Sequence, residues 1–236
     1  METLSLYVHL VMVFATLLTA YFLFKAAHNS KPLLIFISIW LVFQAIMSLS
    51  GFYQVTDAIP PRFLLMVLTP VLLIAYMFIS RRGRKFIDSL DVSKLTLLHV
   101  VRIPVEITLL LLFINKAVPE LMTFEGRNFD IISGVSAVFI YYFGFVKKQI
   151  NKTVILVWNF ICLGLLINIV VNAALSAPSP IQQFAFDQPN VAVLYFPFNW
   201  LPSFIVPVVL FAHLSAIRQL VFGRFDSRST TRGLLN

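Results

Sequence analysis

Long apolar runs separated by short polar stretches follow one another along the whole chain. Seven of these runs reach the roughly 20 residues that an α-helix needs to cross the hydrocarbon core of a bilayer. They predict membrane-spanning helices at residues 3–24, 33–53, 62–80, 95–115, 129–146, 153–175 and 198–220. The stretches between them are too short for a separate soluble domain. We therefore expect an all-α bundle of about seven transmembrane helices that forms one domain over residues 1–236.

The composition favours a membrane protein over a soluble domain. Of the 236 residues, 59% are hydrophobic and only 12% are charged, which is about half the charged share of a typical soluble domain. The mean hydropathy is +0.90. The net charge of +8 does not indicate nucleic-acid binding, because the basic residues lie at the ends of the apolar runs. The single cysteine, Cys162, excludes an intramolecular disulfide.

The positions of the basic residues predict the orientation. Fourteen Lys and Arg residues fall on one side of the predicted bundle and three on the other. The positive-inside rule then places the N-terminus outside and the C-terminus in the cytoplasm. The first run lacks a basic flank and a cleavage site, so it is predicted to be a retained helix and not a signal peptide. The basic run Arg81 to Lys85 is explained by topology, and recruitment of anionic lipids is the alternative.

The fourth predicted helix carries the main candidate chemistry. At about 100° per residue, His99, Arg102 and Glu106 fall within an arc of roughly 60°, so one helix face holds all three. We expect this face to turn inward, because a charge at the bilayer centre costs roughly 2.5 to 3.5 kcal/mol. The spacing of four residues predicts that Arg102 pairs with Glu106. Pro104 removes the helical donor for the carbonyl of Val100 and predicts a kink there.

Polar residues of other predicted helices are expected to complete a polar interior. The sixth helix carries three asparagines, which predict that it is the central helix of the bundle. His213 lies in the cytoplasmic half of the seventh helix and His99 in that of the fourth, so the two meet if these helices are neighbours. The predicted ligand-binding set is Gln44, His99, Arg102, Glu106, Asn168, Asn172 and His213.

Two connections have more than one interpretation. Between the fourth and fifth helices, Asn128 or Asp130 is predicted to cap the following helix. The stretch from Ser176 to Trp200 is rich in proline and aromatic residues. It is interpreted either as an aromatic belt at the outer interface or as a segment that closes the mouth of the bundle.

Three functions from different classes are compatible with these residues. The first is a small-molecule or ion carrier, or a ligand-binding membrane protein, in which Arg102 receives a small anionic ligand and Glu106 balances the charge or exchanges a proton. The second is a membrane-embedded enzyme, or a haem or metal redox protein, that uses His99, Glu106 and His213. The third is a structural subunit of a membrane complex or a homo-oligomer, because no energy-coupling domain is evident. The pattern favours binding over catalysis and identifies no cofactor.

Three motifs resemble a known group of sequences. RIPVE at residues 102–106, MTFEGRNFD at residues 122–130 and the helix around Trp158 and Asn159 are similar to those of uncharacterised polytopic membrane proteins from bacteria. The resemblance covers most of the chain and implies location in a bacterial inner membrane. It implies no activity and no binding residue.

Overall fold

The computed structural model describes residues 4–222, and within this range every regular element is a helix. The long helices are α1 (Leu6–Ala26), α2 (Lys31–Leu49), α3 (Leu64–Ile79), α6 (Arg102–Ile114), α8 (Lys152–Ser176) and α9 (Val206–Val221). Shorter α-helices are α4 (Arg81–Ser89), α5 (Val92–Leu98) and α7 (Asp130–Phe139). The 3₁₀ turns are η1 (Phe52–Gln54), η2 (His99–Val101), η3 (Glu120–Met122) and η5 (Ala192–Leu194), and the π-helical stretches are η4 (Ile140–Val146) and η6 (Leu201–Ile205).

Five helical stretches of the described range are long and apolar enough to cross a membrane. They are α1, α2, the continuous α5–η2–α6, α8 and the continuous η6–α9. A sixth results if α3 and α4, which are bent by 93° at Ser80, form one span. The continuous α7–η4, Asp130–Val146, is apolar but shorter. The chain is therefore all-α and compatible with a membrane protein, whereas the count of seven spans and their orientation stay predictions.

The predicted helices and the observed ones agree closely in position. Each of the seven predicted ranges contains a helix. The main difference follows the third range, where the basic run forms the separate helix α4 from Arg81 onward. The side chain of Ser80 accepts a hydrogen bond from the backbone N–H of Gly83 and so caps this helix.

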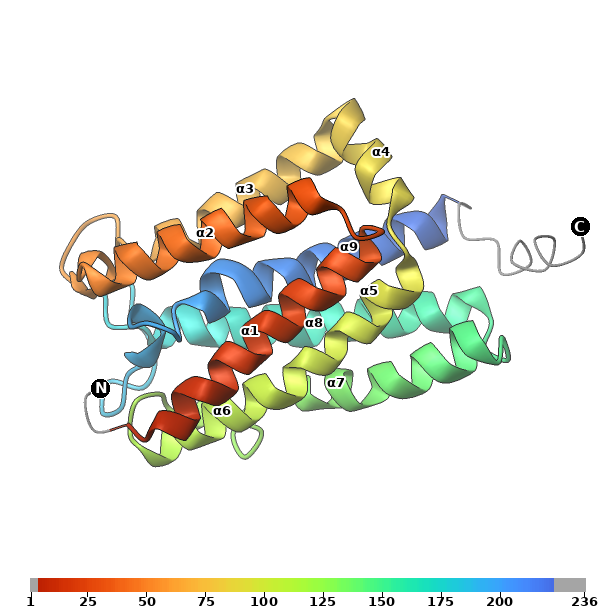
Figure 1. Ribbon diagram of the computed structural model, residues 1–236. Coiled ribbons are helices and arrows are strands. Elements are labelled where there is room, and N and C mark those ends of the chain that lie inside the picture. Colours follow the sequence, from red (N-terminus) through yellow and green to blue (C-terminus); the bar gives the residue numbers. More distant parts are fainter. Residues whose placement is uncertain (1–3, 223–236) are drawn as a thin grey trace, which may run out of the picture.

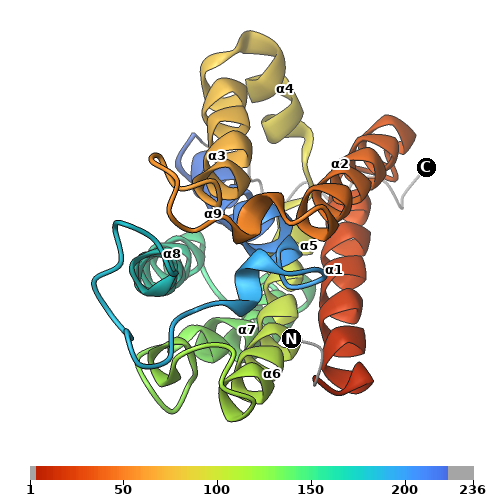
Figure 2. The same ribbon diagram turned by 90° about the vertical axis from the view of Figure 1, so that its left-hand side faces the viewer.

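The stretches α1, α2, α3, α5–α6, α7, α8 and α9 run alternately in opposite directions, and the ends that carry most basic residues gather at the right-hand end of Figure 1. Seen end-on, α9 lies in the middle, with α1, α2, α3, α6, α7 and α8 around it (Figure 2). The buried share of the apolar segment is 67% in the η6–α9 stretch, against 28% in α8. The prediction that the asparagine-rich helix α8 is central is therefore wrong. Apolar residues face both the interior and the outside, so hydrophobicity does not mark the central helix.

The helix that carries Arg102 changes its hydrogen-bonding pattern at Val100, where Pro104 predicts a kink. The α-helix α5 gives way to the 3₁₀ turn η2, which contains Val100, before α6 resumes the α-helical pattern. The missing N–H of Pro104 leaves the carbonyl of Val100 without its usual donor, which explains the change at this point. The span continues through it, so Arg102 and Glu106 stand in α6 one turn apart.

The connection from Ala177 to Trp200 packs against one end of the bundle. The backbone N–H groups of Val191 and Ala192 both donate to the carbonyl of Ala117, beyond the end of α6. Leu194 and Phe198 are buried in hydrophobic clusters. These contacts favour the interpretation in which this segment closes the mouth of the bundle.

Candidate functional site

A buried arginine joins three helices near the middle of the bundle. Arg102 of α6 is only 2% exposed. Its Nη1 donates to Oδ1 of Asp130 in α7 at 2.5 Å, and its Nη2 donates to Nε2 of His213 in α9 at 2.8 Å. The predicted ion pair with Glu106 is therefore wrong, because Arg102 pairs with Asp130 instead.

A close approach of two helices explains this partner. Gly134 lies one turn after Asp130 on α7, and a Cβ atom there would come within 3.3 Å of the Cβ of Arg102. Small residues at such positions let helix backbones come close. The approach brings the carboxylate of Asp130 beside the guanidinium. Sequence spacing within α6 does not reveal a partner on another helix.

The contacts of His213 define its tautomer. A guanidinium only donates hydrogen bonds, so Nε2 of His213 must accept from Arg102. Its Nδ1 therefore carries the hydrogen and donates to Oδ1 of Asn159 at 2.9 Å. Asn159 in turn donates from Nδ2 to the carbonyl of Ile155. One continuous chain of donors thus runs from Arg102 through His213 and Asn159 to the backbone of α8.

His99 lies against His213 but has no polar partner. The two rings stack with centroids 3.9 Å apart and planes 16° from parallel, as expected if their helices are neighbours. Trp158 meets His99 edge-on and donates from Nε1 to Oγ of Ser136. Within residues 4–222, neither nitrogen of His99 has a hydrogen-bond partner. In the same range, no group of three or more His, Cys, Asp or Glu side chains is arranged to hold a metal.

Glu106 is held by an amide. Nδ2 of Asn128 donates to Oε1 of Glu106 at 2.5 Å, while Oδ1 of Asn128 accepts from the backbone N–H of Asp130 at 3.0 Å. The second oxygen of Glu106, Oε2, is buried without a partner in the described range. Asn128 thus bonds the first backbone N–H of α7 from the residue before the N-cap, while the N-cap itself is Phe129, so neither Asn128 nor Asp130 caps this helix as predicted. We call His99, Arg102, Glu106, Asp130 and His213 the charged centre.

One wall of the charged centre opens onto a cavity of about 140 Å³. The cavity lies between α3, α6, α8 and η6–α9, and its lining is apolar apart from Glu106, Asp130 and Asn190. Arg102 is not part of this lining. Nδ2 of Asn190 donates to the carbonyl of Ala173, and its Oδ1 is buried without a partner in the described range. Oε2 of Glu106 and Oδ1 of Asn190 are therefore the fully buried side-chain atoms of the lining that lack a partner in the described range, and both can accept a hydrogen bond.

Three of the predicted ligand-binding residues lie elsewhere. Oε1 of Gln44 accepts from the hydroxyl of Tyr53 at 2.7 Å. Asn168 is exposed and donates to the carbonyl of Arg127, and Asn172 donates to Asn168. None of the three lines the 140 Å³ cavity. Helical spacing shows which residues share a face, but it does not show which neighbour that face meets.

Sequence reasoning missed two residues of the site. Asp130 was expected only as a helix cap, and Asn190 lay in a connection with no assigned role. The available signal for Asp130 was its place at the start of an apolar helix that has small residues one turn later. For Asn190 the sequence offered no such signal.

Comparison with known proteins gives one match. No curated protein and no solved structure matches the chain. The model of a protein family described as a domain of unknown function, DUF8737, matches residues 59–221. This range contains every residue of the charged centre and ends with α9, and it excludes α1 and α2. Because the match covers more than half of the chain, the chain belongs to the DUF8737 family.

Proposed function

We propose that the protein is an integral protein of a bacterial inner membrane that binds, and as a carrier moves, a small molecule or ion beside Glu106. Apolar side chains on its outer faces support the membrane location. Ile39 of α2, Leu72 of α3 and Ile161 of α8 are each 60% to 66% exposed, as suits contact with lipid and not with water. The asymmetry of basic residues supports an outside N-terminus and a cytoplasmic C-terminus.

The observation that carries the binding role is the pair of unpaired acceptors in one cavity. A buried polar atom without a hydrogen bond costs about 1 to 3 kcal/mol. Oε2 of Glu106 and Oδ1 of Asn190 both face this cost, and a ligand that brings a hydrogen-bond donor removes it. A positively charged donor is further favoured, because it stabilises the ionised form of the buried Glu106 carboxyl group. The ligand class is therefore a small apolar molecule with an ammonium or another donor group.

This differs from the anionic ligand that the sequence suggests at Arg102. Both Nη atoms of Arg102 are already bonded, one to Asp130 and one to His213, and Arg102 does not line the cavity. An anion there would have to displace the carboxylate of Asp130. A donor beside Glu106 displaces no existing contact, so it is the better supported ligand.

The size of the cavity suggests a probe. Its volume of about 140 Å³ resembles the roughly 150 Å³ of an engineered apolar cavity that takes benzene. Benzylamine adds an ammonium to such a ring, and benzoate is the matched anion. Thermal unfolding in detergent with each probe measures binding, because a ligand of the native state raises its stability by RT ln(1 + [L]/Kd).

We expect benzylamine to raise the melting temperature of the parent and benzoate to leave it unchanged. Glu106→Gln keeps the acceptor for Asn128 but removes the charge, so it should abolish the response to benzylamine. Glu120→Gln removes an exposed carboxylate of the same type and should respond like the parent. Equal stabilisation of Glu106→Gln and parent by benzylamine, or stabilisation of the parent by benzoate alone, would contradict the proposal.

A second candidate has one observation in its favour. The unpaired nitrogens of His99 suit a membrane-embedded enzyme, or a haem or metal redox protein, that uses His99, Glu106 and His213. The stacked rings of His99 and His213 do not face each other across a common metal, so this function needs another arrangement of the two. The absorbance spectrum and metal content of protein purified from membranes test it. A Soret band or stoichiometric metal would favour this candidate over the first.

A further inference from the structure

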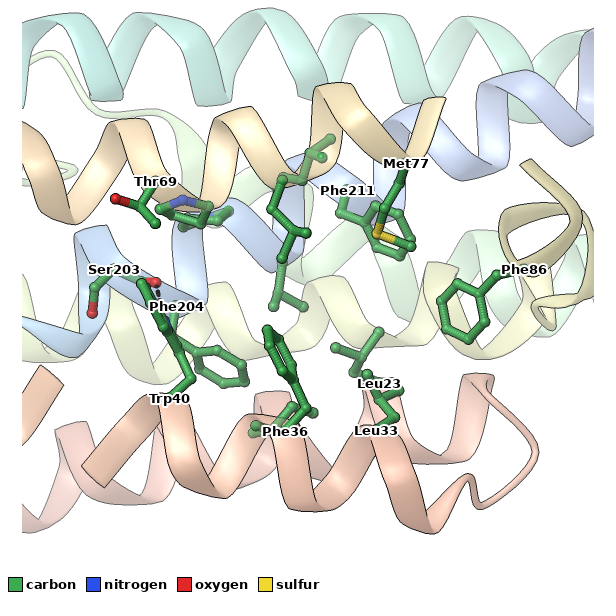
Figure 3. A pocket seen from close by; sticks show the side chains of 16 residues that line it. Leu23, Leu33, Phe36, Trp40, Thr69, Met77, Phe86, Ser203, Phe204 and Phe211 are labelled. Carbon is green, nitrogen blue, oxygen red and sulfur yellow. Dashed lines mark hydrogen bonds between the residues drawn. The ribbon is translucent and has the colours of Figure 1, made fainter. Parts of the chain in front are cut away.

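A second cavity, separate from the charged centre, lies between α2, α3 and η6–α9. Its volume is about 350 Å³. Figure 3 shows Leu33, Met77 and Phe86 together at one end and Trp40, Thr69 and Ser203 at the other. Nε1 of Trp40 donates to the carbonyl of Ser203, and no lining residue has a buried polar side-chain atom without a partner. We call this cavity the apolar groove; unlike the cavity beside Glu106, it offers a ligand hydrocarbon contact alone.

The apolar groove is open toward the outer surface of the bundle. Phe36 of α2 and Leu73 of α3 both line it and are exposed on the surface. From Leu33 to Trp40 it follows seven residues of α2, or about 10 Å at 1.5 Å per residue. Half of a hydrocarbon core of about 30 Å is about 15 Å. The groove therefore fits within one lipid leaflet, of which it covers about two thirds, and does not cross the whole membrane.

Positive charge gathers at one end of the groove. The helix α4 turns 93° from α3 there, and Phe86 of α4 lines the groove. Arg81, Arg82 and Lys85 of α4 are exposed, as is Lys31, two residues before the lining residue Leu33. Within residues 4–222 none of these four side chains makes a hydrogen bond or an ion pair. Other basic residues nearby are already engaged, because Arg84 donates to the carbonyls of Phe78 and Ile79 and Arg218 pairs with Asp88.

We propose that the apolar groove binds one anionic phospholipid. Its acyl chain lies along α2 and α3, and its phosphate lies against Arg81, Arg82, Lys85 and Lys31. The groove supplies hydrocarbon contact over much of one leaflet, and the four cations supply charge complementarity at the level of the headgroups. A partner helix is a poorer occupant, because the groove is only about 10 Å deep along the helix and ends in unpaired charge. This proposal rests on the membrane location but not on a ligand beside Glu106.

The test uses Trp40, which lines the groove, as a reporter. The full chain is placed in vesicles that mix phosphatidylglycerol and phosphatidylcholine, with bromine on the acyl chains of one lipid or the other. Bromine quenches tryptophan fluorescence on contact. The signal of Trp40 is the difference between the parent and Trp40→Phe, which leaves Trp158 and Trp200 in place. The ratio of the two quenching curves gives the relative binding constant of the two lipids in the groove.

We expect phosphatidylglycerol to bind at least tenfold more tightly than phosphatidylcholine, since one basic residue at an anionic surface contributes about fivefold. The triple variant Arg81→Gln/Arg82→Gln/Lys85→Gln should lower this preference to no more than about fivefold, which is what the remaining Lys31 supplies. The control Lys147→Gln/Lys148→Gln/Lys152→Gln removes as many basic residues at the same end of the bundle and should keep it. High salt should also reduce the preference in the parent, which tests the charge without any substitution.

Three results would overturn the proposal. Equal quenching by both lipids in the parent would mean that ordinary surrounding lipid fills the groove. An undiminished preference in the triple variant would place the anionic lipid elsewhere. No quenching of Trp40 by either lipid would mean that protein covers the groove. None of these results depends on benzylamine, so failure here and failure of the proposed function are distinguishable.

Discussion

Two clusters of buried polar side chains connect the helices of this bundle, and they differ in charge and in how many of their buried polar atoms lack a partner. In the neutral cluster, formed by Gln44, Ser48, Tyr53 and Asn199, the hydroxyl of Tyr53 donates to Oε1 of Gln44. Asn199 donates to the carbonyl of Gln44, and Ser48 donates to the carbonyl of Leu194. In the charged centre, both nitrogens of His99, Nε of Arg102 and Oε2 of Glu106 lack partners within the described range.

This difference indicates that the neutral cluster serves helix packing and that the charged centre serves binding. The neutral cluster ties α2 to η1, to η5 and to Asn199 just before η6, largely through bonds to backbone carbonyls. Its one fully buried side-chain atom without a partner in the described range is Oδ1 of Asn199. Such bonds between membrane helices contribute about 0.6 to 2 kcal/mol each. The charged centre carries groups that are costly to bury, leaves several of them open, and borders a cavity. Unused bonding capacity beside a cavity is what a binding site needs.

The largest effect is expected from breaking the ion pair of the charged centre. Asp130→Leu leaves the guanidinium of Arg102 buried without its carboxylate, and we expect the free energy of unfolding to fall by about 3 to 5 kcal/mol. Unfolding in detergent measures this loss. The double variant Arg102→Met/Asp130→Leu removes both charges and should recover most of it, because apolar residues often replace a buried ion pair at little cost.

The same measurement tests which carboxylate is the partner. Glu106→Gln keeps the hydrogen bond from Asn128 and should cost far less than Asp130→Leu. If Glu106→Gln were the more damaging of the two, the pairing seen in the structure would be wrong and the spacing within α6 would be the better guide.

The all-α fold and the positions of its helices followed from the sequence, because the length of an apolar run depends on local composition. The inward face of α6 followed in the same way, since His99, Arg102 and Glu106 are too polar for lipid and are all buried. The partners that these side chains contact on other helices could not be predicted from the sequence. In a membrane, a lipid-facing residue and a core residue are equally apolar, so neither the central helix nor the rotation of its neighbours can be deduced from hydrophobicity.

The asparagines of α8 illustrate this limit. Asn159 reaches the charged centre through His213, whereas Asn168 is exposed and bonds the loop at Arg127. Both are asparagines of one apolar helix. Their roles differ because α9 brings His213 beside Asn159, and this arrangement is set by contacts distant in the sequence.

The next effect in size separates the two stacked histidines. His213→Phe removes the acceptor of Arg102 Nη2 and the donor of Asn159 Oδ1, and we expect a loss of about 2 to 3 kcal/mol because one of these bonds involves a charged group. His99→Phe is the matched control, since its nitrogens have no partner to lose within residues 4–222. It should unfold like the parent or at a higher temperature. A loss from His99→Phe as large as that from His213→Phe would reveal a bound group on His99.

The smallest expected effect concerns the neutral cluster and sharpens its contrast with the charged centre. Tyr53→Phe keeps the ring but removes the hydroxyl that donates to Gln44, so the free energy of unfolding should fall by about 1 kcal/mol. Tyr142→Phe is the control, because Tyr142 is exposed and should change little. The response to benzylamine provides the decisive readout. Since the neutral cluster does not line the cavity beside Glu106, Tyr53→Phe should melt earlier than the parent yet gain as much stability from benzylamine. A reduced gain would mean that the two clusters act together, and the neutral cluster would then belong to the binding site and not to packing alone.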